Sequence, residues 1–549
     1  MSSFVVFFIL SLFSLFPLSL SQPKGILIDC GATTDTVIEG RRWRSDANFV
    51  SGGTPKALEV TVLDPTLSTV RSFPNDLNRK FCYTVRVYRG ARYMVRTTYF
   101  YGGINGRDSP PVFDQMVDGT LWSVVNTTSD YANGMSSYYE GVFLAQGSTM
   151  SVCIGASSYT DSDPFISALE FVIFDDSLYN STDFKNFGLH LVERTSFGYA
   201  GSVIRYPDDK FDRFWEPLGK ENHTLATSRN ISVSGFWNVP PLKIFETGLT
   251  TGQTEPLELN WPLVSLPDAK YYIALYFADT INSSSANSRV FNISINGVTY
   301  YRDLNVTPAG VVVFATQWPL SGFTRITLTP SHNSNSGPLI NGGEIFEVLP
   351  LGGRTLTRDV IALVQFKDSL ENPPLDWNGD PCLPRQYSWT GITCSEGPRI
   401  RVLTLNLTGM SLSGTLSPGI ANMTALNSIL LGNNRLSGTI PDLSSLKRLE
   451  RLHLEDNQFS GEIPSSLGDI ASLRELFLQN NNLTGDIPSS LKGKTGLDLR
   501  TSNVASGYEK DYYVKFLPIT QYAVKHRLTH INNSEIRTIC FPEFFSYQR

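Results

Sequence analysis

The sequence predicts a mainly β, multidomain protein in which a β-sandwich region precedes a short α/β solenoid. Its 549 residues exceed what one hydrophobic core usually organises, so two or more domains are expected. Aromatic residues at 12%, together with 43 Gly and 31 Pro, favour turn-rich strands over helical bundles. Towards the C-terminus, Gly414, Gly438, Gly461 and Gly485 recur at intervals of 24, 23 and 24 residues, which indicates a repeat.

The first 21 residues are expected to be a cleaved secretory signal. Residues 4–20 are apolar apart from three serines and are interrupted by Pro17. Small residues, Ser19 and Ser21, stand where a signal peptidase would cut, although no Lys or Arg precedes the apolar stretch. A signal anchor is the alternative. The mature chain is therefore expected outside the cell.

Asn-x-Ser/Thr sequons are spread along the whole chain and predict a glycosylated surface. A chain rich in Asn, Ser and Thr also forms some sequons by chance, so we expect several rather than all to carry a glycan. The eleven sequons lie at Asn126, Asn180, Asn222, Asn230, Asn282, Asn292, Asn305, Asn406, Asn422, Asn482 and Asn532.

The six cysteines are too few for a disulfide scaffold, but their spacing is informative. Cys382 and Cys394 bracket a short segment and are expected to close a local loop. Cys82 with Cys153 is the preferred second bridge, and the pairing of the two remaining cysteines, Cys30 and Cys540, stays open. Neither Cys-x-x-Cys nor His-Glu-x-x-His occurs, so we predict no metal site and no cofactor.

Residues 25–350 contain many short alternating segments divided by Gly, Asn, Asp and Pro, as expected for the strands of a β-sandwich. Residues 92–99 and 271–277 are two examples. Asn296-Gly297, between two such segments, predicts a hairpin turn.

Motifs in this region resemble the malectin-like region of plant receptor-like kinases. The resemblance implies two malectin-like β-sandwich lobes, over residues 25–185 and 186–350, followed in that family by a few leucine-rich repeats, a membrane span and a kinase. It rests on Ile28-Asp29-Cys30-Gly31, Arg71-Ser72-Phe73-Pro74, Cys82-Tyr83-Thr84, Tyr99-Phe100-Tyr101-Gly102, Pro164-Phe165-Ile166-Ser167-Ala168-Leu169-Glu170 and Arg205-Tyr206-Pro207-Asp208-Asp209 with Asp212-Arg213.

Residues 399–500 carry about four leucine-rich repeats of the form Leu-x-x-Leu-x-Leu-x-x-Asn-x-Leu-x-Gly-x-Ile-Pro. The Leu residues are expected to share a core, while the Asn side chains bond to backbone groups of the neighbouring turn, so the copies must stack. In the weaker first copy, Met410 replaces the Asn. Residues 355–398 resemble the amino-terminal cap of plant-type repeats, with a helix expected over 358–370 after the N-cap Thr357.

Residues 501–549 match neither pattern and form an atypical tail. After Pro488 the chain shows no apolar stretch long enough to cross a bilayer and no kinase motif. We therefore expect a protein secreted to the apoplast or cell surface, anchored to the membrane only if the natural product continues beyond this C-terminus. A net charge of -6 with scattered Lys and Arg excludes nucleic acid as an expected partner.

The expected function is recognition, as a receptor-like protein that binds a cell-wall carbohydrate, a peptide or a co-receptor kinase without catalysis. The alternative is a secreted enzyme acting on wall polysaccharide, because Asp208, Asp209 and Asp212 could supply paired carboxylates. Nearby Arg205, Lys210 and Arg213 instead favour structural charge pairs. We predict no catalytic residue.

Two surfaces are candidates for binding. Since malectin stacks aromatic rings on a disaccharide, the resemblance points to Tyr99, Tyr101, Tyr138 and Tyr139, although aromatic residues in a β-sandwich are more often core residues or cross-strand pairs. On the repeats, strand alternation places Leu430, His453 and Phe477 in line on the concave face, with the Asn406 sequon at its edge. These three residues are predicted to contact a receptor-like kinase co-receptor.

Overall fold

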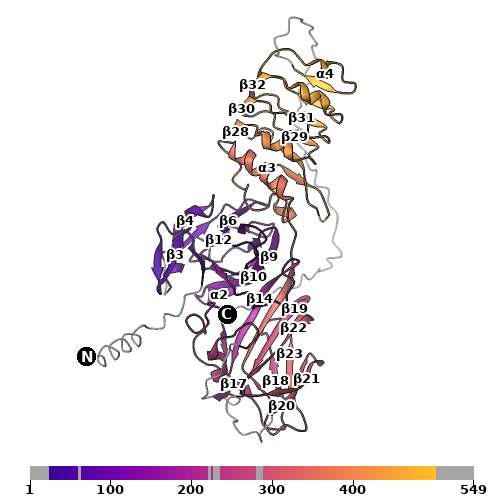
Figure 1. The fold of residues 1–549 in the computed structure, drawn as a ribbon. Coiled ribbons are helices and arrows are strands. Elements are labelled where there is room, and N and C mark those ends of the chain that lie inside the picture. Colours follow the sequence, from indigo (N-terminus) through magenta and orange to yellow (C-terminus); the bar gives the residue numbers. More distant parts are fainter. Residues whose placement is uncertain are drawn as a thin grey trace, which may run out of the picture. The chain divides into compact units, whose positions relative to one another are not determined.

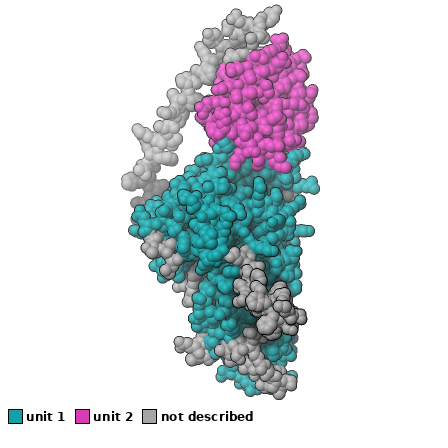
Figure 2. All heavy atoms as spheres, turned by 60° about the vertical axis from the view of Figure 1, so that its left-hand side comes forward, with its two compact units in different colours: residues 1–360, 373–403, 547–549 teal, residues 361–372, 404–546 magenta. Residues whose placement is uncertain are grey.

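The computed structural model describes residues 24–59, 64–219, 224–226, 235–279, 289–397 and 399–501. The secretory signal, the tail beyond residue 501 with Cys540, and the sequons at Asn222, Asn230, Asn282 and Asn532 lie outside the described residues. The described chain divides into two compact units (Figure 2). Unit 1 contains residues 24–360 and 373–403, and unit 2 contains residues 361–372 and 404–501.

Unit 1 is built on one 11-stranded sheet, most of it antiparallel (Figure 1). The strand β15 pairs with β14 beside the main path of the sheet. In spatial order the strands are β2 (Thr36–Ile38), β3 (Arg41–Ser45), β1 (Gly25–Asp29), β13 (Ala168–Ile173), β7 (Arg92–Tyr99), β10 (Ser137–Leu144), β14 (Phe187–Phe197), β25 (Gly342–Pro350), β19 (Leu266–Phe277) and β22 (Val311–Gly322), with β15 at Glu216–Leu218.

Among its described residues, unit 1 also contains four smaller sheets. They are β6 (Lys80–Arg86), β11 (Thr149–Gly155), β8 (Phe113–Val117) and β9 (Thr120–Val125); β12 (Phe165–Ile166), β5 (Thr69–Ser72) and β4 (Thr54–Ala57); β16 (Thr224–Ala226), β17 (Thr247–Thr250) and β24 (Leu339–Ile340); and β18 (Leu257–Asn260), β23 (Arg325–Pro330), β20 (Arg289–Ile295) and β21 (Val298–Val306). The short helices of this region are η1 (Asp46–Asn48), η2 (Pro65–Leu67), α2 (Thr128–Ala132) and η3 (Leu242–Glu246).

Strand alternation sends side chains of the large sheet into different cores. On β7, Tyr93 and Val95 point into a core that also contains residues of β6, β8 and β11. Met94, between them, points into a second core on the other face of the sheet. On β19, Tyr272 lies in the same core as Met94, and Ile273 points into a third. The predicted strands over residues 92–99 and 271–277 are confirmed, and both of their faces are buried because apolar layers cover each side.

The predicted boundary between two lobes, at residues 185 and 186, lies in the turn just before β14, and the large sheet contains strands from both predicted lobes. The strand β14 pairs with β10 on one side and with β25 on the other. The Asn296-Gly297 hairpin is confirmed between β20 and β21, with φ values of 50° and 77° that a tight hairpin turn requires.

Both disulfide pairs named from the sequence are joined in the structure. Cys82 on β6 and Cys153 on β11 face each other across an antiparallel pair, and Cys382 is bonded to Cys394. Cys30 carries a free thiol that is buried, and this burial raises its pKa.

Residues 380–387, in the segment that resembles the cap of the repeats, pack against β6 and β8 within unit 1. The Lys80 ammonium donates hydrogen bonds to the carbonyl oxygens of Asp380, at 2.6 Å, and Leu383. The Tyr387 hydroxyl donates to Asp114 at 2.7 Å. The elements of this stretch are α3 (Thr357–Asp368), η4 (Arg385–Tyr387) and β26 (Ile392–Cys394). The helix predicted over 358–370 is confirmed to within two residues, but Thr357 is its first residue and not its N-cap. Residues 361–368 of α3 belong to unit 2.

Unit 2 is the predicted repeat array, in which strands of successive copies pair in parallel. One sheet contains β27 (Val402–Asn406), β29 (Ser428–Leu430), β31 (Arg451–His453), β33 (Glu475–Phe477) and β35 (Asp498–Arg500), and the other contains β28 (Ser413–Thr415), β30 (Arg435–Thr439), β32 (Gln458–Glu462) and β34 (Asn482–Thr484). The segments between them form η5 (Pro418–Asn422), η6 (Ser465–Asp469) and α4 (Ser489–Lys492).

Candidate functional site

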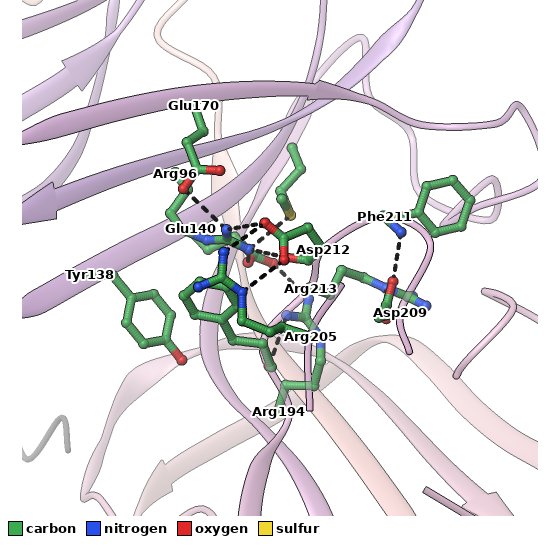
Figure 3. Close-up of polar contacts among 12 residues, drawn as sticks. Arg96, Tyr138, Glu140, Glu170, Arg194, Arg205, Asp209, Phe211, Asp212 and Arg213 are labelled. Atoms are coloured by element: carbon green, nitrogen blue, oxygen red, sulfur yellow. Dashed lines mark hydrogen bonds and ion pairs between the residues drawn. The ribbon is translucent and has the colours of Figure 1, made fainter. Parts of the chain in front are cut away.

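A buried network of ion pairs joins the middle of the large sheet to the segment around residues 205–213 (Figure 3). Five arginines and five carboxylates take part, so their formal charges balance. They are Arg41, Arg96, Arg194, Arg205 and Arg213, with Glu140, Glu170, Asp209, Asp212 and Glu344.

Arg96 and Arg194 form the centre of this network. On β7, Arg96 contacts Glu140 at 3.0 Å and Glu170 at 3.2 Å, and its guanidinium carbon lies 3.6 Å from the centroid of the Phe214 ring. On β14, Arg194 binds Glu140 at 2.7 Å through Nη2. Glu140, on β10, therefore bridges two arginines on the strands that flank it.

Glu344 extends the network to β25. It accepts hydrogen bonds from Arg194 Nε at 2.7 Å and from the hydroxyls of Tyr179 and Tyr276 at 2.7 and 2.6 Å. Burial by itself raises the pKa of this carboxyl, but the charges of Arg194 and Arg213 outweigh it and lower the pKa below its ordinary value. Glu344 is thus held ionised in the interior.

The acidic cluster considered for catalysis belongs to this network. Asp209 binds Arg213 at 2.9 Å and Asp212 binds Arg205 at 3.1 Å, which confirms the structural interpretation for both carboxylates. Asp208 is exposed. Lys210, the third countercharge expected from the sequence, pairs with Asp175 instead of with the cluster.

A cavity of about 380 Å³ lies beside the network, on the side of β10, β14 and β15. Its walls combine apolar and carboxylate side chains. The lining residues are Tyr138, Glu140, Leu191, Val192, Glu193, Arg194, Thr195, Glu216, Pro217, Leu218 and Leu263. Of these, Tyr138 is the residue that the sequence analysis named. The other lining residues lie in ordinary strand and loop sequence, which gives no sign of a pocket.

The structure corrects the predicted sugar platform. Tyr99, Tyr101 and Tyr139 lie in the core of the first half of unit 1, where Tyr99 packs edge-on against Tyr139 at a centroid distance of 5.8 Å. No ring face of these three residues is left for a sugar, because each is at least nine-tenths buried. Tyr138 alone borders the cavity, and its hydroxyl donates to Glu216 at 3.1 Å.

A second candidate surface is the repeat column, formed by Leu430, His453, Phe477 and Arg500 on successive strands of unit 2. Leu430, His453 and Phe477 are partly exposed. The rings of His453 and Phe477 stack at 4.1 Å with an interplanar angle of 16°, and Arg500 lies 4.0 Å from the centroid of Phe477. Sequence reasoning missed Arg500 because the leucine pattern ends before it.

Glu475 and Asn406 lie beside the residues of the repeat column. His453 Nε2 lies 2.8 Å from a Glu475 carboxylate oxygen. Asn406 is exposed and is the register partner of Leu430 on β27. The other described sequons at Asn180, Asn305, Asn422 and Asn482 are exposed, whereas Asn126 and Asn292 are half-buried.

His190, on β14, is a half-buried titratable group. Its Nδ1 accepts a hydrogen bond of 2.9 Å from the indole N–H of Trp122, and its ring stacks over Tyr139 at 6.5 Å. Burial lowers the pKa of His190 to about 4, from an ordinary value of 6.5. The folded protein therefore holds a neutral imidazole with its acceptor nitrogen towards Trp122.

Acidification is expected to destabilise unit 1 through His190. Between pH 6.5 and 4 the unfolded chain binds a proton there that the folded chain does not, so stability falls as pH falls. We expect His190→Gln to remove on the order of 2 kcal/mol of this loss, measured by urea unfolding at several pH values. His332→Gln, at an exposed histidine, is the control. Equal pH dependence in wild type and His190→Gln would contradict the expectation.

Comparison with known proteins gives the family of this fold. The family model of the Malectin-like domain matches residues 28–348, that of the Leucine rich repeat N-terminal domain matches 356–395, and that of the Leucine Rich Repeat matches 448–470 and 472–493. The chain therefore belongs to the malectin-like family, and it also carries leucine-rich repeats.

Two relatives from Arabidopsis thaliana illustrate this membership. One is named a Probable LRR receptor-like serine/threonine-protein kinase and is 32% identical over 503 residues, covering 83% of this chain and 51% of the relative. Another is named a Leucine-rich repeat receptor-like serine/threonine-protein kinase and is 31% identical over 430 residues, covering 74% and 48%. The chain spans about half the length of the curated relatives it matches.

Solved structures with a similar fold include the ANX2 ectodomain from Arabidopsis thaliana, with 16% identity, a TM-score of 0.49, and coverage of 59% of this chain and 97% of that one. A complex of the plant peptide RALF23 with FER and LLG2 is similar at 19% identity and a TM-score of 0.48, and the match covers 60% of this chain and 96% of that one.

Across the described ranges of the present chain, no helix has both the length and the apolar character needed to span a membrane.

Proposed function

We propose that this chain is the recognition part of a receptor-like protein, that it acts at the cell surface or in the apoplast, and that it catalyses no reaction itself. Its ligand is a cell-wall carbohydrate or a peptide, and its partner is a receptor-like kinase co-receptor. The observation that carries the partner proposal is the repeat column, in which Leu430, His453 and Phe477 stand in register and partly exposed.

The chemistry of the repeat column suits a protein contact. The stacked rings of His453 and Phe477 present a rigid aromatic surface, and rigid aromatic anchors contribute most of the binding energy in many interfaces. Arg500 and Glu475 border these rings with opposite charges. An apolar centre with a polar rim is the usual anatomy of a specific interface.

The buried network supports a role without catalysis. Asp209 and Asp212 are both buried and each binds at least one arginine, so neither is positioned to transfer a proton to a polysaccharide. A glycan at Asn406 would cover β27, next to Leu430, and leave the strands that carry His453 and Phe477 open.

The test is the double variant His453→Ala with Phe477→Ala, used as bait for receptor kinases in a pull-down from plant membranes. We expect at least a tenfold loss of partner recovery, because truncation of an aromatic anchor commonly costs about 2 kcal/mol or more. The matched control is Phe323→Ala, which removes a phenylalanine that is 77% exposed in unit 1. Undiminished recovery by a double variant that is secreted and melts like wild type would remove the contact from the repeat column.

A further inference from the structure

We propose that the cavity beside the ion network binds a bulky apolar side chain, aromatic or branched aliphatic, of an extracellular peptide ligand. This inference rests on the proposed recognition role and selects the peptide from the two ligand classes named there. The cavity volume of about 380 Å³ lies in the range of pockets that bury small ligands, so it holds one large side chain with the backbone next to it.

The cavity lies where the strands β10 and β14 separate. One edge of β14 pairs with β25 along residues 187–196. The other edge pairs with β10 at residues 189–190 and with β15 at residues 195–197. Residues 191–194, between these two pairings, line the cavity, and the register of β14 shifts there in a bulge at Val192. Such bulges turn side chains away from the regular strand pattern and are frequent beside binding sites.

Apolar side chains from three elements form much of the lining. Leu263 lines the cavity and is 44% exposed, so the apolar lining reaches solvent at this residue. The residues of a peptide next to the buried side chain would pass over this rim. The five apolar residues are Leu191 and Val192 from β14, Pro217 and Leu218 from β15, and Leu263 from the loop between β18 and β19.

The charged network at the back of the cavity is paired internally. Glu140 binds Arg96 at 3.0 Å and Arg194 at 2.7 Å (Figure 3). Arg194 also binds Glu344 at 2.7 Å. Neither Glu140 nor Arg194 therefore needs a ligand to balance its charge.

The remaining polar side chains of the lining are engaged as well. The Thr195 hydroxyl donates to Glu193 at 2.9 Å and accepts from the indole N–H of Trp261 at 2.8 Å. Glu193 also accepts from the Leu263 amide at 2.9 Å.

The Tyr138 hydroxyl donates to Glu216 at 3.1 Å, and Glu193 and Glu216 each have further partners within the chain. A ligand that brought its own charge would have to compete with these internal partners.

This pairing makes a neutral, apolar occupant the complementary one. A cation, or a sugar with its many hydroxyl groups, binds well only where it finds acceptors and donors to replace those of water. An apolar side chain leaves the internal bonds of the lining intact. Burial of a leucine or phenylalanine side chain is favourable enough to raise affinity by about tenfold or more.

Tyr138 gives this apolar site a rigid wall. Its ring meets Phe214 edge-on at a centroid distance of 5.1 Å, and its hydroxyl is held by Glu216. A site whose side chains are already oriented loses less conformational entropy on binding.

The experiment titrates the secreted protein with four capped amino acids or sugars, followed by ligand-observed NMR. The probes are N-acetyl-phenylalanine methylamide, N-acetyl-alanine methylamide, N-acetyl-arginine methylamide and cellobiose. We expect the phenylalanine probe to bind at least tenfold more tightly than each of the other three. Equal binding of the phenylalanine and alanine probes, or tighter binding of the arginine probe or of cellobiose, would overturn the proposal.

Toluene, as a fifth probe, separates a peptide ligand from a free apolar molecule, because closed apolar cavities also bind small aromatic compounds. We expect toluene to bind more weakly than the phenylalanine probe, whose amide groups lie at the rim. Tighter binding of toluene would assign the cavity to a free apolar molecule and contradict the peptide.

Two variants place the binding in this cavity. Leu218→Trp fills it and should abolish binding of the phenylalanine probe, and Leu263→Ala, at the partly exposed rim, should weaken binding several-fold. The matched control is Leu77→Trp, at a leucine of unit 1 that is 60% exposed and lies outside the lining, and it should bind like wild type. Secretion and the melting temperature report folding of every variant. Wild-type affinity in folded Leu218→Trp and Leu263→Ala proteins would remove the site from the cavity.

The probe titration is independent of the proposed kinase contact, because the lining belongs to unit 1 and the repeat column to unit 2. Absent binding of the phenylalanine probe with retained kinase recovery contradicts the cavity proposal alone. Selective binding of the phenylalanine probe with unchanged kinase recovery by the His453→Ala and Phe477→Ala protein contradicts the repeat-column contact alone.

Discussion

Arg194→Met is expected to lower the free energy of unfolding of unit 1 by about 4 kcal/mol, because it removes one partner from a buried network and leaves Glu140 and Glu344 with one fewer countercharge. Neither carboxylate can reach water to compensate, since both are at most 1% exposed. Urea unfolding at pH 7, followed by tryptophan fluorescence, measures the loss.

The matched control is Arg205→Met. Arg205 belongs to the same network through Asp212, but about a third of its side chain is exposed, so water can replace the lost contact. We expect a loss of about 1 kcal/mol or less there. Combining Arg194→Met with Glu344→Leu should recover part of the stability, because one of the two carboxylates that lost a countercharge is removed as well. Equal effects of Arg194→Met and Arg205→Met would show that burial does not decide the strength of this network.

The fold was predictable wherever the signal is local. The glycine spacing of the repeats reflects a backbone requirement, since Gly438 and Gly461 adopt positive φ values of 81° and 78° at equivalent turns. The Asn296-Gly297 hairpin is likewise determined by the residues of the turn itself. Such features need no knowledge of distant contacts.

The candidate sites were less predictable because their residues are far apart in the sequence. Glu170 and Asp212 appear in motifs that mark the family, but their ion pairs with Arg96 exist only once the chain has folded. The tyrosine platform was wrong for a related reason. Alternation along a strand normally separates core from surface, but β7 and β10 are covered on both faces, so alternation there separates one core from another.

Met410 shows how the structure explains an exception within a repeat. Asn434 bonds through Oδ1 to the Leu412 amide and through Nδ2 to the Leu407 carbonyl, both in the preceding copy. Asn457 bonds in the same way to Leu436 and Leu431. Each ladder asparagine therefore joins its own copy to the one before it. The first copy has no preceding copy of this form, so Met410 occupies the position without breaking such a link.

Asn457→Ala is expected to lower the free energy of unfolding of unit 2 by about 3 kcal/mol. The Asn457 side chain is 8% exposed and forms four hydrogen bonds, donating to the carbonyls of Leu431, Leu454 and Glu455 and accepting from the Leu436 amide. Alanine leaves buried backbone groups without partners, and each such group costs about 1–3 kcal/mol when water cannot reach it.

Asn481→Ala is the matched control for this prediction. Asn481 makes the same four kinds of bond one repeat further on, to Leu454, Leu478, Gln479 and Phe459, but its side chain is partly exposed. Water can therefore satisfy some of the released groups, and we expect about half the loss seen for Asn457→Ala. Urea midpoints of the two variants, measured with equal m-values, test this difference. If Asn481→Ala is the more damaging, stability of the array depends on its C-terminal copy rather than on the buried ladder at its centre.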